Sequence, residues 1–142
     1  MDTLDFSQVQ SKRLIEDNKI TDNWVSRLSN VSNEVQNLVN QIITRTENEV
    51  QCIGRPWFKW YGFYLSEPVR RKTLFAVIII GKKTISICFR VDPDKFEQSS
   101  YVRNVNGFFF PTGTERRVHL NNDRIEQVIN YVKHSYNIIQ NT

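Results

Sequence analysis

The sequence predicts an α+β domain in which two N-terminal helices precede an antiparallel sheet of four to five strands, and a C-terminal helix packs on one face of that sheet. Residues 1–50 contain neither Gly nor Pro, whereas every Gly and Pro lies between Gly54 and Gly113. Because these residue types interrupt helices and form turns, the chain should begin helical and continue as strands. Its 142 residues fit a single domain. We expect a helical part over residues 1–50, a sheet over 55–120 and a last helix over 122–139.

The N-terminal part is expected to hold a short helix over residues 6–17 and a longer one over residues 24–43. Thr21, Asp22 or Asn23 would cap the longer helix, because their side-chain oxygens accept hydrogen bonds from free backbone amides. Its apolar residues recur every three or four positions and form a broad stripe. A broad stripe favours packing on a sheet, although this spacing also suits pairing with a second copy of the chain. The stripe consists of Trp24, Val25, Leu28, Val31, Val35, Leu38, Val39, Ile42 and Ile43.

Five strands are expected, over residues 57–64, 73–80, 84–91, 107–110 and 115–120. The second is apolar from its second residue to its end, which predicts that both of its faces are covered. The third alternates apolar and polar side chains, as is typical of a half-buried strand. The stretch between the third and fourth strands is polar and is expected to be irregular.

The last helix is expected to begin near Asp123, which together with Glu126 matches a capping box. Its apolar residues fall on one helical face, and that face would pack on the sheet. Helices would then cover one face of the sheet, and the other face would be either closed by loops or open as a platform for binding.

Residues 55–90 combine aromatic side chains with positive charge. They hold eight bases against the single acid Glu67, a net charge of +7, whereas residues 1–54 carry −3 and residues 91–142 carry zero. Six aromatic residues fall within residues 57–64. Aromatic rings stack on nucleobases, and Lys and Arg neutralise phosphates. The stretch therefore predicts a surface for nucleic acid or a nucleotide-like polyanion, unless these rings only fill the core and rim of the sheet.

Strand alternation divides the aromatic residues of this stretch between two faces. Lysine is seldom buried without a partner, so the face that Lys59 shares with Trp57, Tyr61 and Phe63 is expected to point into solvent. The other face, with Phe58, Trp60, Gly62 and Tyr64, would then enter the core. The candidate nucleic-acid or polyanion-binding residues are Trp57, Lys59, Tyr61, Arg70, Arg71, Lys72, Lys82, Lys83 and Arg90.

A second candidate anion site is the turn that contains Gly113 and precedes Arg116 and Arg117. Backbone amides of such a turn and a guanidinium group can hold a phosphate together. A plain hairpin turn is the alternative, because Gly is common in any such turn.

We expect no catalytic residue, no metal and no cofactor. The two histidines and two cysteines lack the spacing typical of metal ligands. Asp94 and Glu115 are a faint match to the acid pair of a metal-dependent nuclease. A turn-forming role for Asp94 is the alternative, because Asp and Pro are common in turns.

The sequence predicts a cytoplasmic protein without a membrane partner. The N-terminus lacks the basic-then-apolar pattern of a signal peptide, and the longest apolar run, residues 74–80, is too short to span a bilayer. Cys52 and Cys88 are too few for a disulfide framework, so we expect reduced thiols.

Three stretches of the second half resemble a known domain family. They are Leu74–Ile80 with Gly81-Lys82-Lys83-Thr84, Val102-Arg103-Asn104-Val105 with Pro111-Thr112-Gly113-Thr114, and residues 129–133 with Ser135-Tyr136. Over residues 58–139 they resemble a small uncharacterised prokaryotic domain often labelled a predicted transport protein, which occurs near restriction-type and mobile-element proteins. Its layout is similar to the frataxin-like α-β-α arrangement of YjbR-type proteins. The resemblance implies a setting in prokaryotic defence or mobile elements, and it supplies no site residue.

The leading hypothesis is a small non-enzymatic module that holds nucleic acid or a nucleotide-like ligand on a basic, aromatic sheet face. The alternative is a protein-interaction subunit that forms a homodimer, or binds another protein, through the helix over residues 24–43. A metal-dependent nuclease is the third hypothesis.

Overall fold

The computed structural model describes residues 21–81 and 84–142, and these confirm an α+β fold built on an antiparallel sheet. Residues 21–29 are helical, α2 (Asn33–Glu49) follows them, and α3 (Ile125–Gln140) comes last. The sheet of the described residues has one strand more than the expected maximum, and its order is β1-β2-β3-β4-β6-β5. The strands are β1 (Ile53–Pro56), β2 (Trp60–Tyr64), β3 (Leu74–Ile80), β4 (Ile85–Arg90), β5 (Val102–Val105) and β6 (Glu115–His119).

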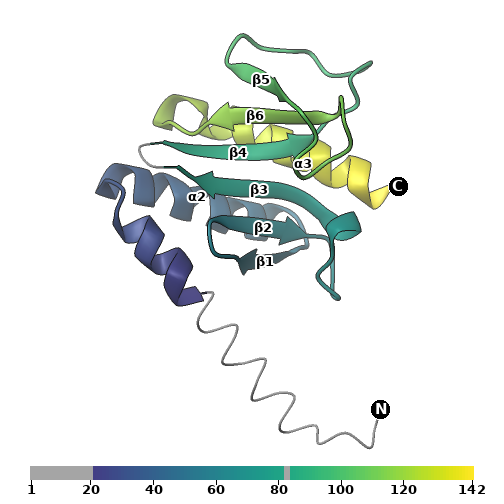
Figure 1. Cartoon of the computed structure of the whole chain (residues 1–142). Helices are drawn as coiled ribbons and strands as arrows, with labels where there is room; N and C mark the ends of the chain where they lie inside the picture. Colours follow the sequence, from purple (N-terminus) through teal and green to yellow (C-terminus); the bar gives the residue numbers. More distant parts are fainter. Residues whose placement is uncertain (1–20, 82–83) are drawn as a thin grey trace, which may run out of the picture.

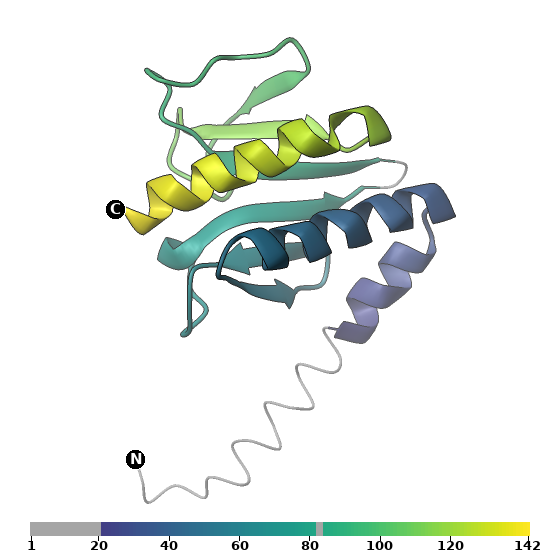
Figure 2. The ribbon, with the colours of Figure 1, turned by 180° about the vertical axis from the view of Figure 1, so that it is seen from behind.

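Both α2 and α3 lie against the same face of the sheet. Figure 1 shows the sheet in front of these two helices, and Figure 2, seen from behind, shows the helices in front of the sheet. The helix α3 contacts β3 and β4, and it also contacts α2 beside it. The opposite face of the sheet, which faces the viewer in Figure 1, is called the open face below.

The main core lies between the two helices and the sheet. Phe63, Phe75 and Phe89 are fully buried in it. Tyr136 of α3 meets Phe75 edge to face with ring centroids 5.2 Å apart, and Tyr131 stacks on Phe89 at 5.0 Å. These ring contacts hold α3 across β3 and β4, because aromatic pairs contribute packing energy in defined geometries.

The longer N-terminal helix is interrupted where the sequence predicted a continuous one. The side chain of Ser32 accepts a hydrogen bond from the amide of Val35 at 3.2 Å and so caps a new helix, α2. Trp24 and Ile42, on either side of the break, are buried in the same core against the sheet. Most of the apolar stripe therefore packs within the chain, whereas Val25 is exposed. The short helix expected over residues 6–17 lies outside the described residues.

Two strands were predicted at the wrong positions. Residues 57–59 connect β1 to β2 and do not begin a strand, and the amide of Trp57 donates to the carbonyl of Trp60 at 2.7 Å across this turn. Residues 107–110 form a loop that begins at Gly107, whose φ of +39° suits a turn and not a strand. The strand β5 lies earlier, in the stretch expected to be irregular, because its residues pair with β6.

Ser135 of α3 completes the hydrogen bonding at one end of the β3–β4 ladder. Its hydroxyl donates to the carbonyl of Phe75 at 2.5 Å and accepts from the amide of Arg90 at 2.9 Å. The paired register of β3 and β4 runs only as far as Ala76 and Phe89, so both backbone groups lie beyond the last ladder pair. Because Ser135 is fully buried, water cannot replace it at this position.

Replacing Ser135 with Ala should lower the free energy of unfolding by about 2 kcal/mol, because a buried amide and a buried carbonyl each lose their partner. Chemical denaturation measures this loss. Asn137→Ala, at an exposed position of the same helix, is the control and should change stability little. Equal effects of the two substitutions would show that the hydroxyl does not join α3 to the sheet.

Candidate functional site

The open face carries one row of side chains that runs across five strands. The strand register aligns Gly62, Val77, Cys88, Arg117 and Arg103 in this row. Val77 and Cys88 belong to a small apolar cluster that is separate from the main core. Side chains alternate between the faces of a sheet, so the neighbouring row enters the helix-covered core. The register continues to Arg55 of β1, which pairs with Gly62, so the row ends in a cation on β1 as well as on β5.

The prediction that Tyr61 points into solvent with Lys59 is wrong. Tyr61 lies opposite Ile78 in the sheet and faces the helices, with its ring 5.6 Å from that of Trp24. Its hydroxyl donates to Glu47 of α2 at 3.2 Å, and burial raises its pKa. Alternation could not be counted from Lys59, because residues 57–59 are a turn and the strand begins only at residue 60.

The aromatic side chains that reach the open face are those that the sequence assigned to the core. Trp60 and Tyr64 of β2 contact the small apolar cluster on that side or belong to it. Trp57 joins them from the turn, because its indole Nε1 donates to the Tyr64 hydroxyl at 2.9 Å and its ring lies 5.4 Å from that of Trp60. The guanidinium of Arg55 sits 4.2 Å over the Trp57 ring.

The loop between β5 and β6 adds a second wall to this aromatic group. Phe109 meets Trp60 edge to face at 5.3 Å, and the neighbouring ring of Phe108 is 64% exposed. A cavity of about 370 Å³, within the usual size range of ligand pockets, lies between this loop and the sheet. We call it the aromatic cavity; its walls include Trp57, Trp60, Tyr64, Phe108, Phe109 and Arg71.

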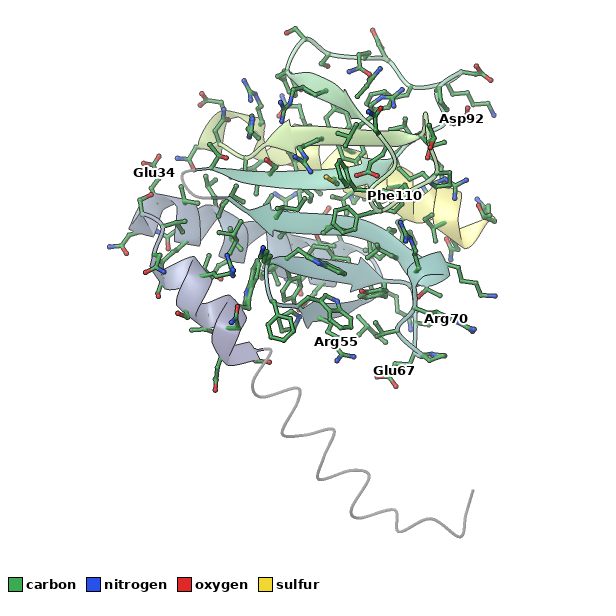
Figure 3. All side chains as sticks on the ribbon, viewed as in Figure 1. Glu34, Arg55, Glu67, Arg70, Asp92 and Phe110 are labelled. Atoms are coloured by element: carbon green, nitrogen blue, oxygen red, sulfur yellow. The ribbon has the colours of Figure 1, made fainter. Side chains whose placement is uncertain are left out.

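Glu115 holds this loop on the sheet. It is fully buried, and its Oε1 accepts hydrogen bonds from the amides of Phe109 at 2.8 Å and Phe110 at 3.0 Å. Figure 3 shows Phe110 over the open face, where it covers the small cluster that includes Val77 and Cys88. The other oxygen of Glu115, Oε2, is buried without a hydrogen-bond partner. Two charge-assisted hydrogen bonds compensate part of the cost of burying this carboxylate.

A second cavity, of about 490 Å³, lies beside the aromatic cavity and shares Arg71, Leu74 and Phe109 with it. Its walls also include Lys72 and Arg90, so three cations surround it, and we call it the cationic cavity. The Arg71 side chain donates to the carbonyl of Phe108 at 2.7 Å and thereby fixes the wall between the two cavities.

The predicted binding residues thus do not form a single site. Arg70 is exposed and lines the aromatic cavity, whereas Lys59 is exposed in the β1–β2 turn and lines neither cavity. Figure 3 labels Arg70 at the lower right of the open-face view, near the loop that carries Glu67. Lys82 and Lys83 lie outside the described residues.

The far side of the open face carries further positive charge around His119. Its Nδ1 lies 3.0 Å from the hydroxyl of Ser86, the residue opposite it on β4. Burial and, after it, the charges of Arg103, Arg117 and Arg124 lower the pKa of His119. Arg117 donates to the sulfur of Cys88 at 3.3 Å, and burial raises the pKa of that thiol to about 11.

The prediction of an anion site at the turn before β6 is wrong. Arg116 and Arg117 point to opposite faces of the sheet, so they cannot hold one anion together. The Arg116 guanidinium is 7% exposed and donates to the carbonyls of Gly113 and Glu115 and to the side chain of Gln98. Gly113 presents its carbonyl oxygen to this cation and serves as a turn residue with φ of +86°.

The nuclease hypothesis gains no site from the described part of the chain. Within it, no three of the His, Cys, Asp and Glu side chains gather as a metal ion would require. Asp94 is exposed in a turn, where its amide bonds to the side chain of Asp92 at 3.2 Å. Glu115, its expected partner, is occupied by the amides of the β5–β6 loop.

Comparisons with known proteins neither name a family nor supply a relative: no protein-family model matches the chain, and no curated protein matches it. Across residues 21–81 and 84–142, no helix is both long enough and apolar enough to pass through a bilayer. The open face is therefore assessed on its geometry alone.

Sequence reasoning missed Phe108, Phe109 and Glu115 as parts of the site. Three consecutive Phe residues between a Gly and a Pro were assigned to a strand, although such a pair of turn residues is equally typical of a loop. The residue type alone does not indicate that Glu115 is buried, because the turn that separates it from Phe109 and Phe110 is what brings their amides to its carboxylate. Arg103 was missed together with β5.

Replacing Glu115 with Ala should lower the free energy of unfolding by about 2 kcal/mol, because two loop amides lose a charged acceptor. Hydrogen exchange at the amides of Phe109 and Phe110 should speed up more than elsewhere in the chain. Glu115→Gln retains a carbonyl acceptor and should lose less. Normal protection of both amides in Glu115→Ala would contradict the role of this carboxylate.

The imidazole of His119 should titrate below the ordinary histidine value of about 6.5. Because its pKa is lower in the folded chain, the unfolded chain takes up the proton first as the pH falls below that value, and His119 then destabilises the fold. Arg103→Gln should raise the pKa of His119 in an NMR titration, whereas Lys95→Gln, a control outside the open face, should not. An unchanged pKa in Arg103→Gln would show that the arginines do not act on it.

Proposed function

We propose that the open face binds single-stranded nucleic acid and catalyses no reaction on it. The observation that carries this proposal is the aromatic cavity, whose walls include Arg70 and Arg71, on the face opposite α2 and α3. Every nucleobase has a flat face that stacks on an aromatic ring, and every phosphate attracts Arg and Lys. Bases in a duplex are already stacked on each other, so unpaired bases suit this surface best.

The balance of charge on the sheet supports the proposal. Glu115 is the only acid within the six described strands, and it is fully buried. Arg90, Arg103 and Arg117 face the open side according to the strand register. Arg71 adds a further charge beside them, from the connection between β2 and β3. A face with this excess attracts a polyanion over a distance of about one Debye length.

The alternative of self-association through the helix over residues 24–43 has less support. Trp24, Leu38 and Ile42 are buried within the chain, and the largest apolar exposure on this helical region is Val25 at 55%. One exposed Val is ordinary on a protein surface. The family resemblance extends the proposal to a cytoplasmic protein in a prokaryotic defence or mobile-element setting.

Fluorescence anisotropy with a labelled single-stranded oligonucleotide tests the proposal. Binding should weaken steeply with salt, and each lost phosphate contact should reduce the magnitude of the slope of log K against log salt by about 0.7. Lys72→Gln should show this change, whereas Lys95→Gln, at an exposed position beside α3, should not. No detectable binding at low salt, or equal slopes for the two variants, would refute the proposal.

The aromatic contribution is measured in the same assay. Phe108→Ala removes a ring that is 64% exposed, so the fold should be unaffected. Loss of one stacked ring should weaken binding by about 1–3 kcal/mol. Val25→Ala removes an exposed apolar side chain on the helical side of the molecule and should leave the affinity unchanged.

A further inference from the structure

The aromatic cavity and the cationic cavity lie side by side, and Arg71, Leu74 and Phe109 line both. One part is bordered by ring faces and the other by three cations. The boundary between them is fixed by the hydrogen bond from Arg71 to the carbonyl of Phe108. A ligand that fills both parts must combine a flat, apolar group with a nearby anion.

The aromatic cavity suits a nucleobase better than a polar group. The two polar atoms that point toward one another from its walls, Trp57 Nε1 and the Tyr64 hydroxyl, already bond to each other at 2.9 Å. They therefore demand no partner from a ligand, and the remaining wall is mostly ring carbon. Such a wall accepts any base by stacking and selects little between them.

The cationic cavity suits a phosphate monoester. Arg90, one of its walls, has a buried Nε atom without a hydrogen-bond partner, and a buried donor in this state costs free energy until an acceptor arrives. Glu115 lies opposite Arg90 across the strands. Counted with Arg71 and Lys72, these four side chains carry a net charge of +2. That charge matches a monoester of about −2 better than a diester within a strand, which carries one negative charge.

We propose that the two cavities bind one terminal nucleotide, with its base in the aromatic cavity and its terminal phosphate monoester in the cationic cavity. This inference rests on the proposed function and adds to it a preference for the phosphorylated end of a strand. A free mononucleotide also carries a base and a phosphate monoester, so the test includes both a mononucleotide and phosphorylated strands.

The test measures dissociation constants for five probes: one oligonucleotide sequence with a 5′-phosphate, with a 3′-phosphate and with hydroxyl groups at both ends, adenosine monophosphate, and adenosine. One of the phosphorylated strands should bind about tenfold tighter than the hydroxyl strand, as expected for new charge-assisted hydrogen bonds. Adenosine monophosphate should compete with that strand, and adenosine should compete more weakly.

Single substitutions test whether the preference for a phosphorylated strand arises in the cationic cavity. Arg90→Gln and Lys72→Gln should each reduce the ratio between phosphorylated and hydroxyl strands toward one. Lys72 is exposed, so its replacement keeps the test valid should Arg90→Gln fail to fold. Arg103→Gln should weaken the binding of the phosphorylated and the hydroxyl oligonucleotide by the same factor, because Arg103 lies on the open face and lines neither cavity. Lys95→Gln should change neither.

The outcomes separate this inference from the proposed function. If all strands bind equally, the terminal-nucleotide site is wrong and strand binding stands. If adenosine monophosphate binds in preference to adenosine while no strand binds, strand binding is wrong and the nucleotide site stands. If no probe binds at low salt, both are wrong. If Arg90→Gln and Lys72→Gln both still bind the phosphorylated strand more tightly than the hydroxyl strand, the terminal-nucleotide site is also wrong.

Discussion

A sheet has two faces, and in the described part of this chain both long helices, α2 and α3, lie on the same one. The rest of the structure follows from this one-sided cover. The central strand β3 is apolar on both faces, so the side chains that point away from the helices need another cover. The β5–β6 loop provides it for Val77 and Cys88 by placing Phe110 over them. The rest of that face stays accessible.

The cover is held by hydrogen bonds as well as by the packing of Phe110. Glu115 is the residue that ties the loop to the sheet, through two amides and a fully buried carboxylate. The same loop forms one wall of the aromatic cavity, so the carboxylate that stabilises the fold also shapes the candidate site. Arg90 lies opposite it on the neighbouring strand, and the Nε atom of Arg90 is buried without a hydrogen-bond partner. The β5–β6 loop and Glu115 thus serve both the stability of the fold and the shape of the aromatic cavity.

The sequence predicts the class of the fold well and the faces of its strands poorly. The change from residues without Gly and Pro to residues rich in them locates the step from helix to sheet, and the continuous apolar run of β3 correctly indicates cover on both sides. Tyr61 and Trp60 were assigned to the wrong faces because the alternation of side chains was counted from Lys59. Residues 57–59 form a turn, so the alternation begins only at residue 60. Arg116 was expected to bind an anion, but carbonyls of its own turn occupy its guanidinium. Both errors arise from the local course of the backbone, which residue types and strand alternation do not reveal.

The central claim is that a strand binds the open face and not the helix-covered face, and the three tryptophans of the chain report on both. Trp57 and Trp60 line the aromatic cavity, whereas Trp24 is buried under the helical side. The most direct measurement is a two-dimensional NMR titration of the indole N–H signals with a single-stranded oligonucleotide. The account predicts that the signals of Trp57 and Trp60 shift while that of Trp24 stays in place. A shift of Trp24 alone, or no shift of any indole under conditions where the strand binds, would contradict it.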